Sequence, residues 1–224
     1  MAIKKKEEAK QPVVEVSKLQ QWFDKNKKTI SWIGTIAILA VVGVFAYISF
    51  YSRPRNEAAR DAVAAAMTLL GEAPDSTSYA TALSGDGVTK GLEAVISEYG
   101  SRAASAYLYA AVCEMNLGNF EKAKAYLDDY STDDPIFKAR AIAAKADCDV
   151  ELGNTEAAAK AYLKAAEASD DIIAARYLFK AGLAFEELGQ NDKAVEAYKK
   201  IKSRYADSFE AQNIDIYISK LETE

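Results

Sequence analysis

The chain has 224 residues, of which 50% are apolar and 27% charged, a composition typical of folded proteins and too apolar for a disordered one. It contains no histidine, which excludes Ser-His-Asp and Cys-His catalysis and imidazole metal sites, although carboxylate or lysine chemistry stays open. Residues 1–28 hold eight lysines and four acidic residues, a net charge of +4, whereas the other 20 basic and 29 acidic residues give −9. A folded part this acidic argues against nucleic acid as a partner.

The first predicted elements are a basic cytoplasmic tail, residues 1–28, and a single transmembrane helix, residues 29–52. The run TISWIGTIAILAVVGVFAYISFYS contains no charge in 24 residues. As a helix it would extend roughly 36 Å, which exceeds the hydrocarbon core of about 30 Å. Trp32 lies near one end and Tyr47 near the other, as expected of interfacial aromatics. The run is longer than the apolar region of a signal peptide and ends in bulky aromatics, so we expect an uncleaved anchor.

The orientation of this helix follows from the lysines. All eight lysines of residues 1–28 precede the helix, and Arg53, Arg55 and Arg60 follow it. Because basic residues favour the cytoplasmic side, the tail is predicted inside and the folded domain outside.

Residues 53–101 predict an irregular helical region that forms a degenerate first repeat. An alanine-rich helix is expected from Arg55 to Leu70, a short one from Asp75-Ser76 to Leu83, and an amphipathic one around residues 92–99. Gly85-Asp86-Gly87 lacks the lysine and the preceding strand of a phosphate loop, so it predicts a turn.

Residues 102–224 contain a short sequence motif that recurs at a fixed period. The glycines of the three copies are 35 and 36 residues apart, and an alanine follows each glycine by five residues. A period in this range is typical of stacked repeats. The repeat-defining residues are Gly118 and Ala123, Gly153 and Ala158, and Gly189 and Ala194.

Each copy of the motif is predicted to end one helix and begin the next. Glycine permits the left-handed conformation that ends a helix, and the alanine must be small where two paired helices approach. A single pair cannot bury its apolar face alone, so the pairs stack. In the last segment, an apolar stripe of Ile214, Tyr217, Ile218 and Leu221 predicts a capping helix.

These spacings resemble the tetratricopeptide repeat, including its small residue at Ala111, Ala146 and Gly182. The predicted fold is therefore all-α: a single N-terminal transmembrane helix, then a tetratricopeptide-like α-solenoid with a C-terminal capping helix.

Two cysteines and three acidic pairs are further candidate sites. Cys113 and Cys148 occupy equivalent repeat positions, where Ala184 stands in the third copy, so a small buried group is expected. A disulfide is the alternative outside the cytosol, but stacked helices 8–10 Å apart exceed the roughly 7 Å that a disulfide spans. Asp128-Asp129, Asp133-Asp134 and Asp170-Asp171 lack the spacing of a calcium loop, and Asp134 and Asp170 are expected to cap helices. No metal or cofactor is expected.

A peptide groove is predicted along the first helices of the repeats. Carboxylate-clamp members of the tetratricopeptide family carry basic and asparagine residues at five groove positions. In this chain those positions are Leu108, Val112, Ala144, Arg176 and Lys180, and only Arg176 and Lys180 are of the required type. The groove is therefore expected to be partly apolar; burial of these residues between repeats is the equal alternative. The candidate groove residues are Leu108, Tyr109, Val112, Met115, Arg176, Phe179 and Lys180.

The order of segments resembles a known family. A lysine-rich tail, one anchor, the stretch ALSGDG…GLEAVISEYG and repeats ending AGLAFEELGQNDKAVEAYKKIKSRYADS are similar to YfgM-type membrane-anchored tetratricopeptide proteins. The resemblance implies an ancillary subunit of the Sec translocon in the bacterial inner membrane, with its C-terminal domain in the periplasm. The implied partners are the translocon, a PpiD-type chaperone and secretory client proteins. Separately, no pair of catalytic groups stands out in the sequence, so no enzymatic activity is expected. The alternative is a scaffold in envelope assembly or division.

Overall fold

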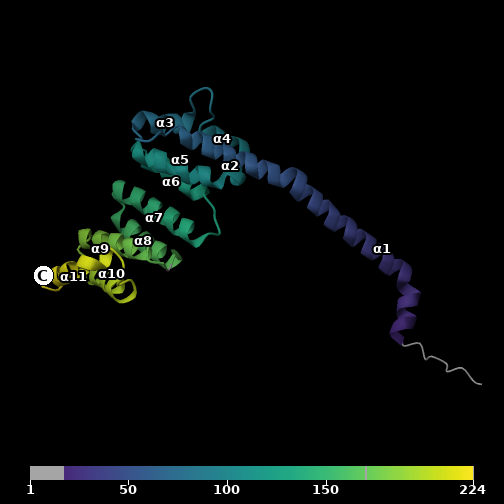
Figure 1. Ribbon diagram of the computed structural model, residues 1–224. Coiled ribbons are helices and arrows are strands. Elements are labelled where there is room, and N and C mark those ends of the chain that lie inside the picture. The colour runs from purple at the N-terminus through teal and green to yellow at the C-terminus, as the bar shows by residue number, and fades with distance from the viewer. Residues whose placement is uncertain (1–17, 170, 224) are drawn as a thin grey trace, which may run out of the picture. The chain divides into compact units, whose positions relative to one another are not determined.

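The computed structural model describes residues 18–169 and 171–223 (Figure 1). It divides into two compact units, Met1–Pro54 and Arg55–Glu224. In the first unit, helix α1 spans Lys18–Tyr47 and is followed by the π-helix η1, Ile48–Ser52. Helix α1 thus begins inside the segment expected to be the basic tail, of which residues 1–17 lie outside the described residues.

The apolar part of this unit is exposed. Trp32, Ile36, Leu39 and Phe45 are each more than 60% exposed, and none of the most apolar stretch is buried. Among the described residues, one helical stretch, Gln20–Thr68, is long and apolar enough to cross a membrane. By length and composition it is a candidate membrane span.

The second unit begins with three helices that share one core. They are α2 (Arg53–Thr68), α3 (Ser76–Ser84) and α4 (Leu92–Tyr99). The N-terminus of α3 is closed by a reciprocal capping box, in which the Ser78 amide donates to Asp75 and the Asp75 amide donates to the Ser78 hydroxyl. Ala59, Val63 and Leu92 of these helices are buried together with Cys113 of the following helix.

Three helix pairs follow, and Figure 1 shows them stacked in chain order from teal to yellow. The pairs are α5 (Ala104–Asn116) with α6 (Phe120–Asp129), α7 (Pro135–Glu151) with α8 (Thr155–Ser169), and α9 (Ala174–Glu187) with α10 (Asn191–Arg204). Within the described residues there is no strand, only an isolated bridge between Gly85 and Lys90. The predicted all-α solenoid is confirmed.

Each pair turns at a glycine in the left-handed region. The φ angles of Gly118, Gly153 and Gly189 are +77°, +77° and +66°. The amide after each glycine donates to the carbonyl five residues earlier, at 2.8, 2.7 and 2.8 Å, and the glycine amide itself donates to the carbonyl three residues earlier. This pair of bonds is the Schellman ending, which satisfies the last carbonyls of the helix.

The core of the stack is built from small residues. The repeat alanines Ala123, Ala158 and Ala194 are fully buried, one on the second helix of each pair. Because alanine adds little bulk, the backbones of paired helices can approach closely, and Tyr162 and Tyr198 fill the remaining space.

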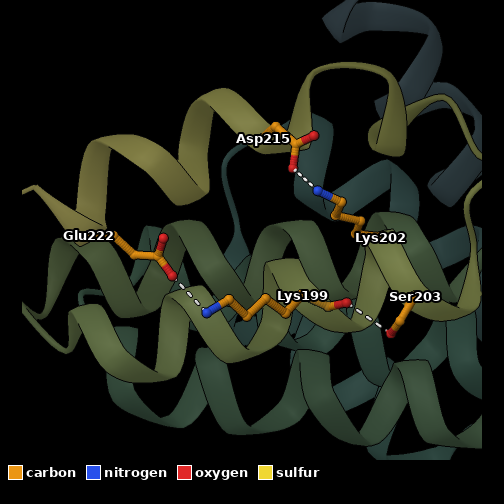
Figure 2. A network of polar contacts seen from close by, with 5 residues as sticks. All are labelled: Lys199, Lys202, Ser203, Asp215 and Glu222. Atoms are coloured by element: carbon orange, nitrogen blue, oxygen red, sulfur yellow. Dashed lines mark hydrogen bonds and ion pairs between the residues drawn. The ribbon is translucent and has the colours of Figure 1, made fainter.

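The chain ends in a 3₁₀ turn, η3 (Glu210–Asn213), and helix α11 (Ile214–Glu222). Its apolar stripe, Ile214, Ile218 and Leu221, is buried against the last pair. Figure 2 shows two ion pairs at its edges, Lys199 with Glu222 and Lys202 with Asp215, both with nitrogen–oxygen distances of 2.6 Å. Helix α11 therefore covers the end of the stack.

Candidate functional site

The most apolar pocket found among the described residues has a volume of about 490 Å³ and lies between α5, α7 and the loop after α6. Helix α5 contributes Leu108, Tyr109 and Val112, which belong to the groove set predicted from the sequence. Helix α7 adds Phe137 and Ala144. The loop adds Tyr130, Ser131 and Thr132.

Two aromatic rings and Val112 give this pocket its exposed apolar surface. Tyr109 is 39% exposed and Phe137 43% exposed, although both lie on helices whose other faces are buried. The α5 residues at positions 108, 109 and 112 share a face because helical residues three and four apart are neighbours. Ala106, Ala110 and Cys113 form the adjoining face of α5 and are buried in the core, whereas Tyr109 and Val112 on the pocket face stay exposed.

One cation lines the pocket. The Arg140 guanidinium lies 5.6 Å from the centroid of the Phe137 ring, within the range of a cation–π contact. In the part of the chain that the structure describes, no carboxylate forms an ion pair with Arg140. The pocket therefore combines an apolar floor, a few hydroxyl groups and one positive charge.

The other predicted groove residues lie elsewhere. Lys180 pairs with Asp147 at 2.7 Å and lies 5.5 Å from the Tyr162 ring centroid. The Tyr162 hydroxyl donates to the same Asp147 carboxylate at 2.5 Å. Burial, and after it this hydrogen bond, raises the pKa of Tyr162 well above its usual value. Arg176 forms an ion pair with Glu210 at 3.5 Å. These contacts join α9 to the neighbouring elements.

The remaining two predicted residues pack inside the protein. Phe179 contacts Tyr217 edge to face, with ring centroids 5.0 Å apart, and also lies against Tyr198. Met115 packs on a buried cluster that contains Ala123, Leu127 and Cys148. The structure thus divides the predicted set into an open pocket on α5, polar contacts on α9, and packing between repeats.

Sequence reasoning named Ala144 of α7 as a groove position but missed Phe137 and Arg140. Phe137 and Arg140 lie in the first turns of α7, directly after the Asp134 cap, whose carboxylate accepts from the amides of Ile136 and Phe137. The apolar pair Ile136-Phe137 precedes the buried pattern that begins at Ala139. Two apolar residues just before the core-facing stripe of a helix were the available signal.

The cysteines are buried and free. Cys113 belongs to the core of α2–α5, whereas Cys148 belongs to a separate cluster with α6. Burial raises the pKa of each thiol to about 11, with a further contribution from nearby carboxylates. Both thiols therefore stay protonated at neutral pH.

The acidic residues have structural contacts. Buried Glu114 accepts from the Asn119 side-chain amide at 2.7 Å, and buried Asp149 is ion-paired with Lys124. Asp86 accepts from the amides of Val88 and Thr89 at 2.9 and 2.6 Å, and these bonds lower its pKa.

Residues of the acidic pairs singled out in the sequence also form contacts within the protein. Asp128 pairs with Lys145, whereas Asp170, expected to cap a helix, lies outside the described residues. No group of three metal-ligating side chains occurs in the described part of the chain.

Comparison with known families agrees with this architecture. Models of the tetratricopeptide repeat match residues 105–135, 139–172 and 176–208, which correspond to the three helix pairs. No curated protein matches the chain. The second unit therefore contains tetratricopeptide repeats, which indicate a protein–protein interaction module.

Proposed function

We propose that this protein is a membrane-anchored interaction module that binds apolar segments of partner proteins, without catalysis. The observation that carries the proposal is the open pocket between α5 and α7. Exposed aromatic rings in a concave site are typical of surfaces that bind other proteins, because they bury large area at small entropic cost. Tyr109 and Phe137 supply these rings, and Arg140 can pair with a carboxylate of the partner.

The anchor supports the same proposal. We place the protein in the bacterial inner membrane, with residues 1–28 in the cytoplasm and the repeats in the periplasm, on the strength of the exposed apolar helix and the excess of lysines before it. Tethering raises the local concentration of the pocket near the membrane, so weak contacts with partners become useful.

The proposed partners follow from the resemblance to YfgM-type proteins. The repeats would work beside the Sec translocon, with a PpiD-type membrane-anchored chaperone, on secretory proteins that emerge from the membrane. Such clients expose apolar segments before they fold, and the pocket at Leu108 and Val112 has the chemistry to hold one apolar side chain. The second candidate is a scaffold for envelope assembly or division, which would use the same surface.

Photo-crosslinking in cells tests the proposal. A photoreactive phenylalanine analogue at Tyr109 or Val112 is expected to crosslink translocon subunits, the chaperone or secretory proteins. The matched control places the same group at Lys164, an exposed residue of α8 outside the pocket. Crosslinks equal at Lys164 and Val112 would contradict the pocket, and crosslinks to division or envelope-assembly proteins alone would favour the second candidate.

A charge introduced into the pocket sharpens this experiment. Val112→Glu should abolish crosslinking from Tyr109, because a carboxylate is costly against an apolar segment. Ala157→Glu adds the same group at an exposed position of α8 and should leave crosslinking unchanged. Protease protection in sealed cells tests the topology, since a shielded C-terminal domain in cells with a permeable outer membrane would reverse it.

A further inference from the structure

The start of α1 has a composition different from that of the apolar run that follows it. Residues 20–28 are helical, yet they carry Lys25, Lys27 and Lys28 against a single acid, Asp24. The same nine residues contain two large aromatic side chains, Trp22 and Phe23, which are 60% and 52% exposed. We call residues 20–28 the foot of α1.

The aromatic side chains of the foot lie on one face. In a helix with 3.6 residues per turn, Trp22, Asn26 and Ile30 follow at intervals of four, and Phe23 lies beside them. Lys25 and Lys27 fall on either side of this face. A helix with aromatics on one side and lysines flanking them is typical of segments that lie in a membrane interface.

The foot is also bent away from the remainder of α1, as the purple end of the helix in Figure 1 shows. The Asn26 side-chain amide donates to the Trp22 carbonyl at 2.8 Å. In a regular helix this carbonyl accepts a hydrogen bond from the backbone amide of residue 26. The Asn26 side chain therefore competes with the backbone hydrogen bond of the helix at this point. Such competition is a known cause of helix bending.

We propose that the foot binds anionic phospholipid headgroups, with Trp22 and Phe23 inserted at the interface and Lys25, Lys27 and Lys28 paired with lipid phosphates. Charge complementarity selects this partner: the rest of the chain beyond residue 28 carries −9 and is repelled by an anionic surface, whereas the foot is attracted. The inference rests on the proposed anchoring of the chain in a membrane, and it adds a lipid class and a binding surface to it.

The chain contains two tryptophans, Trp22 and Trp32, so each can be observed alone. Full-length Trp32→Phe protein, in which Trp22 is the only tryptophan, is reconstituted into vesicles of phosphatidylcholine alone or mixed with phosphatidylglycerol. In the anionic vesicles, Trp22 emission is expected to shift to the blue and to be quenched by lipids brominated near the headgroup end of the acyl chain. Phosphatidylcholine alone should give several-fold less quenching.

The lysines are tested by Lys25→Gln, Lys27→Gln and Lys28→Gln together. Each lysine near a charged surface contributes about fivefold, so the three substitutions together should lower the ratio of membrane-bound to unbound residues 20–28 by about a hundredfold in anionic vesicles. The matched control replaces three exposed lysines of the repeats, Lys138, Lys160 and Lys164, by glutamine and should leave quenching unchanged.

The outcomes separate this inference from the anchor itself. Trp22 emission typical of water in both vesicles, with Trp32 quenched in the Trp22→Phe variant, would overturn the inference and leave the anchor intact. Equal quenching of Trp22 in both lipids would overturn the preference for anionic lipid. If the blue shift of Trp22 depended on the protein-to-lipid ratio and not on the lipid charge, the aromatic face would be packing against a second copy of the chain. If neither tryptophan is quenched, both proposals fail.

Discussion

The ring of Tyr198 lies directly over Gly182. A Cβ atom added to Gly182 would lie 2.5 Å from Cζ and 2.9 Å from Cδ1 of that ring. The equivalent pair in the preceding repeat is Ala146 and Tyr162, which accommodates a Cβ. The hydroxyl groups explain the difference: Tyr162 donates to Asp147, one residue after the alanine, whereas Tyr198 donates to Glu186, four residues after the glycine. The ring of Tyr198 is therefore drawn across position 182.

We expect Gly182→Ala to destabilise the protein by about 1–3 kcal/mol, because an extra methyl group in a closely packed core forces side chains or backbone to shift. The loss should be visible as a lower urea midpoint for the full chain in mild detergent. Adding Glu186→Gln, which weakens the bond that holds the Tyr198 hydroxyl, should reduce the loss caused by Gly182→Ala. Strictly additive effects of the two changes would contradict this account.

The turn glycines present the opposite case. A Cβ at Gly153 would meet nothing within 4 Å, but its φ angle is +77°. Gly153→Ala should therefore cost about 1–2 kcal/mol through the backbone alone, and Gly153→Asn should cost less, since asparagine tolerates the left-handed region. The urea midpoints of the two variants give the comparison. An equal loss for alanine and asparagine would show that the side chain meets an obstacle after all.

The repeats could be predicted from the sequence because local chemistry determines them. A glycine at +77° and a capping aspartate such as Asp134 act within a few residues, so their spacing indicates where helices end and begin. The pocket could not be read in the same way. Whether Phe179 faces a partner or Tyr217 depends on how α9 and α11 pack, and whether Phe137 joins Tyr109 depends on the stacking of two repeats. Such long-range packing leaves no periodic signal in the sequence.

The two cysteines should be unreactive in the folded protein. Because both thiols are buried and their pKa is raised to about 11, we expect a maleimide at pH 7.5 to label neither until denaturant is added. Rapid labelling of the native protein would show that one of the clusters opens readily.

The same pKa shift predicts a pH dependence of stability. In the unfolded chain the thiols lose their protons near pH 8.5, whereas in the fold they keep them to about 11. The unfolded state therefore binds fewer protons between these values, and the free energy of unfolding should fall as the pH rises through this window. The Cys113→Ala, Cys148→Ala double variant should lack this part of the decline; lysines and tyrosines also titrate there, so the difference between the two proteins is the measurement.

The last prediction separates the two kinds of contact that hold α11. The ion pairs of Lys199 with Glu222 and Lys202 with Asp215 join side chains that are all more than half exposed, and exposed pairs of this kind contribute little because water and salt screen them. Ile214, in contrast, is almost fully buried against the end of the stack.

We therefore expect Lys199→Gln with Lys202→Gln to change the free energy of unfolding by no more than about 1 kcal/mol, and Ile214→Ala to lower it by about 2–5 kcal/mol. Hydrogen exchange of the α10 and α11 amides provides the local measurement, since loss of the cap should expose the last pair first. If the lysine variant loosened α11 as much as Ile214→Ala did, the ion pairs drawn in Figure 2, rather than the buried stripe, would hold the end of the solenoid in place.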